Sequence, residues 1–434
     1  MRLISLIALF LLTCLTGCNT EKGIEYITNL KAAAYFEKVE SICNTDNGDL
    51  WGMNLYGPLM LVDVDTRRIF ANMPDSLGLL KQKDGIYTGI YPGDQVISNF
   101  AVTFGNTLFA MAPLPENEDN YRITARCLHG LFHCMQNKKG IDNQDYNPAH
   151  MNEPDARIWL KMEWKALEKA IKSESTVREQ AIRDALIFRN TRREIYPYYT
   201  EDENLFENYE GLATFTYMLL ASDSHDSYTK TLLEYLHRIY NFSFTHSYGF
   251  VHGALYAYLL HDYGFDFSTI DMPGIDLGER LRNMIDITLP EVSRDVAGSL
   301  AVNYDIEMVR REETERFKRI REGLHRRTSS FTDKPVVYLT LESPSFIFEP
   351  EDIEPVDSLG VIYKKLKVTD NWGKLNVSEG GCLVSPNLRY IRVPARSVRI
   401  DRNHITGDGW HIYLSENWRM DEMDNNYYIR KLIP

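Results

Sequence analysis

The chain has 434 residues, of which 44% are apolar and 25% are charged, as is usual for globular proteins. Its formal net charge of −13 disfavours nucleic acid and anionic lipid surfaces as partners, because both repel a negatively charged protein. The length is sufficient for two or three domains, and 6 cysteines are too few for a dense disulfide framework.

Residues 1–17 have the proportions of a signal peptide. Arg2 supplies a positive charge, and the apolar run from Leu3 to Leu12 is too short to cross a bilayer comfortably. The run ends in Leu-Thr-Gly-Cys, which resembles the lipobox of bacterial lipoproteins. That resemblance implies a lipid anchor on Cys18, a polar tether over 18–25 and a place in the cell envelope, where Asn19 favours the outer membrane. An ordinary secretory signal is the alternative.

The rest of the chain divides into three parts by its apolar pattern. Apolar positions at helical spacing predict a helix over 26–42, and β-branched and aromatic runs over 54–112 predict a mostly antiparallel sheet. We therefore expect an α+β fold with a β-rich part (26–120), a helical part (121–330) and a C-terminal β-rich module (331–434). The expected helices are 121–137, 155–173, 176–194, 204–221, 227–240, 250–262, 276–287 and 302–327.

His129 and His133 lie four residues apart in the first helix of the helical part. Residues at this spacing lie about 40° apart around a helix, so both imidazoles can bind one ion. A zinc site needs a third protein ligand, and a catalytic site keeps one position open. Glu163 and Glu210 are the two candidates, because each interrupts an otherwise apolar helix face. Pairing to an arginine is the alternative for each of them.

Two segments resemble the gluzincin metallopeptidases, which take two zinc ligands from an HExxH helix and a third from a glutamate on a later helix. HGLFH at 129–133 corresponds to a degenerate HExxH, and YEGLATFT at 209–216 is similar to the glutamate-bearing segment. The chain is more similar still to a group of secreted bacterial proteins with further motifs. Those motifs appear here as HGLFHCMQ (129–136), NPAH (147–150), MEWKAL (162–167) and GDGW (407–410).

The resemblance implies a zincin-like sheet followed by a helical core, with zinc bound by His129, His133 and Glu210. It places Glu163 and His150 around the ligands or beside a substrate, with Glu163 as the rival third ligand. It also implies a peptide or protein ligand. Gly130 stands where gluzincins have the glutamate that acts as general base. Such a group contributes about 10²–10⁴-fold to the rate. We therefore expect impaired peptide hydrolysis and extra space beside the metal at Gly130.

Three consequences of the missing base stay open at this point. The protein can keep its zinc and act in binding, or Glu153, Asp155, Glu163 or His150 can stand in as the base. The third consequence is loss of the zinc itself. The leading prediction is a cell-envelope lipoprotein with a gluzincin-like metallopeptidase frame that is catalytically impaired. The alternative is a metal-free binding or scaffold lipoprotein of the envelope.

Overall fold

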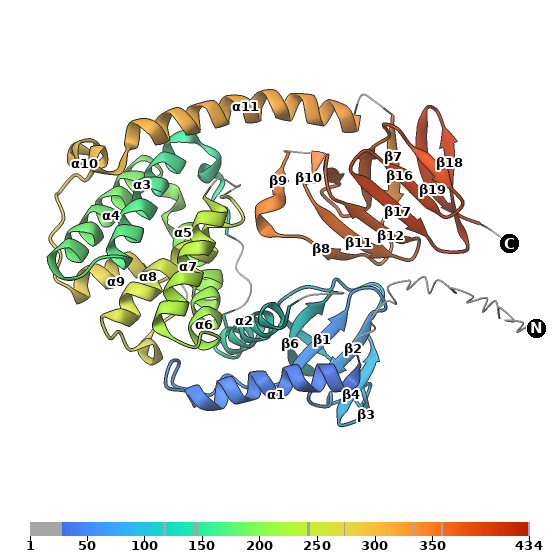
Figure 1. Ribbon diagram of the computed structural model, residues 1–434, viewed down its shortest axis with the longest axis horizontal. Helices are drawn as coiled ribbons and strands as arrows, with labels where there is room; N and C mark the ends of the chain where they lie inside the picture. Colours follow the sequence, from blue (N-terminus) through green and yellow to red (C-terminus); the bar gives the residue numbers. More distant parts are fainter. Residues whose placement is uncertain are drawn as a thin grey trace, which may run out of the picture.

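The protein is described from a computed structural model. The structure describes residues 28–115, 119–141, 146–240, 244–272, 274–332, 335–356 and 359–432. The predicted signal peptide, the lipidation site at Cys18 and the tether all lie outside the described residues. The predicted mixture of helices and sheets is confirmed (Figure 1). Within the described ranges, no helix is both long enough and apolar enough to cross a membrane.

The N-terminal part consists of helix α1 (Asn29–Asp46) and a six-stranded sheet with the order β3-β4-β2-β1-β6-β5. All neighbouring strands are antiparallel except β1 and β6, which run parallel. The expected, mostly antiparallel sheet is therefore confirmed, and β5 forms one edge of it. The strands are β1 (Leu59–Asp63), β2 (Arg68–Ala71), β3 (Lys81–Lys83), β4 (Ile86–Ile90), β5 (Ala101–Phe104) and β6 (Thr107–Leu114).

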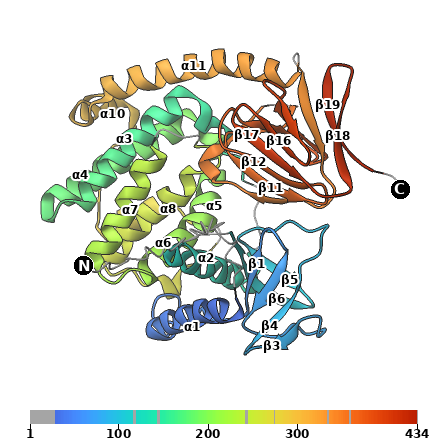
Figure 2. The same ribbon diagram turned by 45° about the vertical axis from the view of Figure 1, so that its right-hand side comes forward.

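Side chains alternate across this sheet, as strand geometry requires. Leu59 and Ala110 belong to the core that the sheet shares with the helices, whereas Met60 and Met111 belong to a second core on the opposite face. Helix α2 (Asn120–Lys138) covers the first face and lies between the sheet and the remaining helices (Figure 2). The side chain of Asp119 caps the start of α2 by accepting a hydrogen bond from a backbone N–H.

The helical part follows α2 and packs around the same core. Its predicted helices are confirmed, although the segment 204–221 is divided into three pieces and one further helix, α10, is present. The elements are α3 (Pro154–Ile171), α4 (Ser175–Ile195), α5 (Thr200–Phe206), η3 (Glu207–Gly211), α6 (Leu212–Leu220), α7 (His225–Ile239), α8 (Tyr248–Asp262), α9 (Leu277–Met284) and α10 (Arg294–Ala301).

Segment η3 is a π-helical turn between α5 and α6, and such turns are frequent at functional sites. It crosses α8 at very short range. A Cβ atom on Gly211 would lie 2.6 Å from the Cα of Gly253, and a Cβ on Gly253 would collide with the backbone carbonyl of Glu207. Both positions therefore require glycine, and this close crossing fixes the place of the residue before Gly211, which is Glu210.

Helix α11 (Ile306–Thr332) runs from the helical part to the C-terminal β-rich part (Figure 1). The expected C-terminal β-rich module is present, and it consists of two sheets packed over one core. The first has the order β18-β19-β7-β14-β13-β10-β9 and the second the order β15-β16-β17-β12-β11-β8. The strands are β7 (Val336–Thr340), β8 (Ser345–Ile347), β9 (Ile353–Pro355), β10 (Val361–Tyr363), β11 (Leu366–Asp370), β12 (Gly373–Val377), β13 (Cys382–Val384), β14 (Tyr390–Pro394), β15 (Arg399–Asp401), β16 (His404–Gly407), β17 (Trp410–Leu414), β18 (Trp418–Met423) and β19 (Asn426–Lys431).

Candidate metal centre

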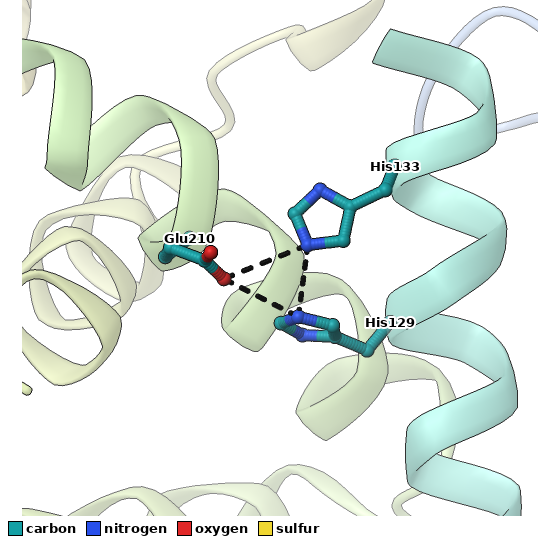
Figure 3. Close-up of side chains that lie close together, drawn as sticks. All are labelled: His129, His133 and Glu210. Carbon is teal, nitrogen blue, oxygen red and sulfur yellow. Dashed lines mark hydrogen bonds and ion pairs between the residues drawn. The ribbon is translucent and has the colours of Figure 1, made fainter. Parts of the chain in front are cut away.

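The two histidines of α2 point to the same place, as their spacing predicts. The Nε2 atoms of His129 and His133 lie 2.9 Å apart, and both rings are buried. Glu210 reaches the pair from η3 on the opposite side (Figure 3). Its Oε2 atom lies 3.3 Å from Nε2 of His129 and 3.5 Å from Nε2 of His133. Two turns of helix that are about 80 residues apart thus meet at one point.

These three atoms have the spacing of zinc ligands. A tetrahedral zinc ion with bonds of about 2.0–2.1 Å holds its ligand atoms about 3.3 Å apart. The observed separations of 2.9, 3.3 and 3.5 Å lie close to that value. Oε2 of Glu210 is moreover buried without a hydrogen-bond partner, which is costly for a carboxylate oxygen unless a cation binds it. Among the described residues, these three form the one group of metal-binding side chains with such spacing.

The electrostatics of the site favour the protonation states that a metal requires of His129 and Glu210. Burial lowers the pKa of His129, and the neighbouring His133 lowers it further, so the imidazole of His129 stays neutral. Burial alone would raise the pKa of Glu210, but the two imidazoles outweigh it and lower that pKa to about 2. A neutral imidazole at His129 and an ionised carboxylate at Glu210 are the states in which such side chains bind zinc.

Aromatic rings surround the centre, and the sequence predicted this position for none of them, although Tyr209 belongs to the YEGLATFT segment. Tyr209 stacks on His133 with the ring centres 4.5 Å apart, and Phe250 lies parallel to His129 at 6.3 Å. Phe100, in the bend just before β5, lies 5.8 Å from His133. Tyr146 is partly buried, and its proximity to Glu210 adds to the effect of burial in raising the Tyr146 pKa. The position of Tyr209 next to Glu210 was the signal available in the sequence.

A cleft opens beside His133 and has a volume of about 320 Å³. This volume is at the lower end of the range for small-molecule and cofactor sites. The cleft follows the edge strand β5, and its walls are mostly apolar. They comprise Val96, Ser98, Phe100, Ala101, Val102, Met111, Asn137, Ile141 and Tyr209, together with His133.

Gly130 does not leave space beside the candidate metal site, contrary to the expectation from the sequence. The residue faces strand β6, and a Cβ atom built on it would lie 3.2 Å from the Cβ of Ala110 and 3.5 Å from its Cα. Helix α2 lies so close to the sheet at this point that a larger residue at position 130 would press against β6. Glycine at position 130 therefore allows the helix to pack tightly on the sheet.

Glu163 does not join the metal group, so its prediction as rival third ligand is wrong. Its side chain is fully buried on α3 and forms ion pairs with Arg189 and Arg192. Its Oε1 also accepts a hydrogen bond of 2.6 Å from the hydroxyl of Tyr256 and lies 3.1 Å from Nε2 of His252. The alternative interpretation, an inward glutamate paired to arginine, is the one that the structure supports.

Glu163 belongs to a large buried group, here called the arginine cluster. Arg189 binds Glu207 in a two-pronged contact of 3.0 and 2.7 Å, and Arg192 and Arg193 both bind Glu203. Each buried charge thus has an oppositely charged neighbour, which offsets the cost of removing it from water. The cluster comprises Glu163, Arg189, Arg192, Arg193, Glu203, Glu207, His150, His252 and Asp276.

The other predicted stand-ins for the base also lie elsewhere. His150 is buried in the arginine cluster, where its Nε2 lies 2.8 Å from Oε1 of Glu203. The side chains of Glu153 and Asp155 are exposed at the start of α3. Spacing in the sequence could not separate these groups from the candidate ligands, because each one also lies near a motif.

Comparison with known proteins gives no family for this chain. No family model matches it, and neither a curated protein nor a solved structure is detectably similar to it. The arguments for function therefore come from the site itself.

Proposed function

We propose that this protein is a zinc-binding lipoprotein of the cell envelope, built on a gluzincin-like metallopeptidase frame and impaired in peptide hydrolysis. The observation that carries the proposal is the meeting of His129, His133 and Glu210 at ligand spacing, with a buried oxygen of Glu210 that lacks a hydrogen bond. The order of the elements, a sheet, a histidine helix and a later glutamate-bearing helix, supports a zincin-like arrangement.

Bound zinc would act as a Lewis acid, and it would lower the pKa of a water molecule that it binds to about 7. The chain's own residues supply the ligands, the aromatic walls and the apolar cleft beside β5. An edge strand can pair with an extended chain through its free backbone groups, so a peptide or protein is the ligand we propose for this cleft. No side chain at position 130 can accept a proton, and this absence is the reason for expecting weak hydrolysis.

A metal-free scaffold is the second candidate function. The distance of 2.9 Å between the two Nε2 atoms also suits a direct hydrogen bond from one imidazole to the other. In that case the pair and Glu210 would stabilise the packing of α2 against η3 and would bind no ion. Metal content separates the two candidates.

The deciding experiment is elemental analysis of the protein purified without residues 1–17. We expect about one zinc per chain, and loss of that zinc in the variants His129→Ala and Glu210→Gln. Thr191→Val is the matched control, because Thr191 is buried on α4 and bonds only within its own helix, to the carbonyl of Ile187. A protein that remains folded and binds no zinc from a buffered solution would exclude the metal centre and favour the scaffold.

The lipid anchor is proposed from the sequence alone. Mass spectrometry of the N-terminal peptide from the membrane fraction should find acyl groups on Cys18. Several acyl chains hold a protein stably on a membrane, since each buried CH₂ contributes about 0.8 kcal/mol. The variant Cys18→Ser should therefore leave the membrane fraction, and a variant that stays there would contradict the proposal.

A further inference from the structure

Gln136 lies between the two elements that carry the metal ligands. It is on α2, one turn after His133, and its side chain is fully buried. Its Oε1 atom lies 2.7 Å from Nδ1 of His133. Its Nε2 atom lies 3.3 Å from the backbone carbonyl oxygens of both Asn208 and Tyr209, which are in η3. One side chain therefore contacts a ligand of the first element and the backbone of the second.

The direction of each of these hydrogen bonds follows from the chemistry of the groups. A backbone carbonyl can only accept, so the NH₂ group of Gln136 must face Asn208 and Tyr209 and donate to both. The amide oxygen of Gln136 then faces His133 and can only accept. Nδ1 of His133 must therefore carry the proton and donate to that oxygen.

This assignment fixes the chemical state of the other ring nitrogen. A neutral imidazole with its proton on Nδ1 has a free electron pair on Nε2, and Nε2 of His133 is the atom that faces Glu210. Without an acceptor at Nδ1, the proton could occupy either nitrogen. The ring would also lose one of the contacts that set its rotation about the Cβ–Cγ bond, the other being the stacked ring of Tyr209.

We infer that Gln136 is a positioning residue for the proposed metal centre. It holds His133 in the state and orientation that a metal needs, and it ties the backbone immediately before Glu210 to the histidine helix. The inference rests on the proposed function. Partners of metal-binding histidines commonly change metal affinity by 10–100-fold when they are removed. His133 and Gln136 are three residues apart, so they lie on one face of the helix, and the sequence HxxQ is sufficient to predict that their side chains meet.

The first test measures zinc affinity of the full-length protein in detergent by competition with a coloured chelator. Gln136→Met keeps the length of the side chain and removes both sets of hydrogen bonds, so we expect affinity to fall 10–100-fold. Gln136→Glu keeps an acceptor for His133 and loses the donor to η3, so its affinity should lie between those of Gln136→Met and the wild type. Thr191→Val, which removes a buried hydroxyl on α4, should bind zinc like the wild type.

The second test needs no metal. Nitrogen-15 NMR of histidine-labelled, metal-free protein at alkaline pH distinguishes the two neutral forms of His133, whose signal is assigned with the variant His133→Asn. The wild type should show the proton on Nδ1, and Gln136→Met should show a mixture or the opposite form. An unchanged His133 signal in Gln136→Met overturns the inference, whether or not the protein binds zinc.

The two tests keep the inference apart from the proposed function. A wild type with no zinc but with the expected change of His133 in Gln136→Met would refute the metal centre and leave Gln136 as the group that orients His133. A zinc-binding wild type whose affinity falls less than threefold in folded Gln136→Met would refute the role of Gln136 alone. An equal loss in Thr191→Val would show that the effect is general destabilisation, and it too would overturn the inference.

Discussion

The contact between Gly130 and Ala110 decides how much stability a side chain at position 130 of the histidine helix costs. Replacing Gly130 by alanine would place two Cβ atoms 3.2 Å apart, whereas carbon atoms pack best at about 3.5–4.0 Å. Ala110 cannot move easily, because β6 pairs with β1 on one side and with β5 on the other. The overpacking should cost about 1–3 kcal/mol.

Helix propensity works in the opposite direction. Alanine is favoured over glycine inside a helix by about 1 kcal/mol, so Gly130→Ala should be destabilising by about 0–2 kcal/mol in total. Gly298→Ala is the matched control, since a Cβ on Gly298 in α10 meets nothing within 4 Å and should stabilise by about 1 kcal/mol. Ala110→Gly should relieve the contact, so the double variant should be more stable than the sum of the single effects by about 1–3 kcal/mol.

The measurement is urea unfolding of the four members of the cycle, followed by tryptophan fluorescence. Trp51 is a suitable probe, because its ring lies 4.9 Å from that of Phe132 on α2. A Gly130→Ala variant as stabilised as Gly298→Ala would refute the reasoning. It would mean that α2 can move away from β6, and that the glycine is not required by the packing.

Three further predictions follow from the same structure. Gly130→Glu alone should lower stability and give no peptidase activity. Gly130→Glu combined with Ala110→Gly should raise hydrolysis of a peptide library. If both folded variants are inactive, a glutamate at position 130 cannot act as a base here. Gly211→Ala should destabilise more than Gly130→Ala, because its Cβ would lie only 2.6 Å from a backbone atom of Gly253, and a thermal melt that is unchanged would contradict the close crossing. Stability of the metal-free protein should fall as the pH drops below about 4–5, where the carboxylates of the unfolded chain take up protons. Burial alone would raise the pKa of Glu163, Glu203 and Asp276 in the arginine cluster, but the neighbouring arginines lower the pKa of each below its usual value. These carboxylates therefore stabilise the fold above that pH, and this stabilisation is lost as the pH falls further. Melting temperatures that do not change between pH 6 and pH 3 would count against this.

The elements of the fold were largely predictable, because their signals are local. Periodic apolar residues located the helices, and β-branched runs located both β-rich parts. The π-helical turn η3 was not predicted. It depends on the crossing with α8, where Gly211 meets Gly253, and a contact between residues about 40 positions apart leaves no periodic signal.

The sequence also determined two of the three residues of the candidate site. His129 and His133 share a helix face by their spacing alone, and the structure brings them together as expected. Glu210 and Glu163 could not be separated in the same way, because both are glutamates on apolar helix faces. Only the tertiary structure shows that Glu210 lies beside the imidazoles, whereas Glu163 pairs with Arg189 and Arg192.

The sequence also could not predict which groups surround each residue of the site. A sequence shows that position 130 has no side chain, but it cannot show that β6 occupies the adjacent space. It likewise gives the spacing of Gln136 from His133, but not the carbonyl groups of η3 that orient its amide. Local spacing is set by the covalent chain and can be read directly. The partner on another element is set by how the whole chain packs, and so only the folded structure decides it.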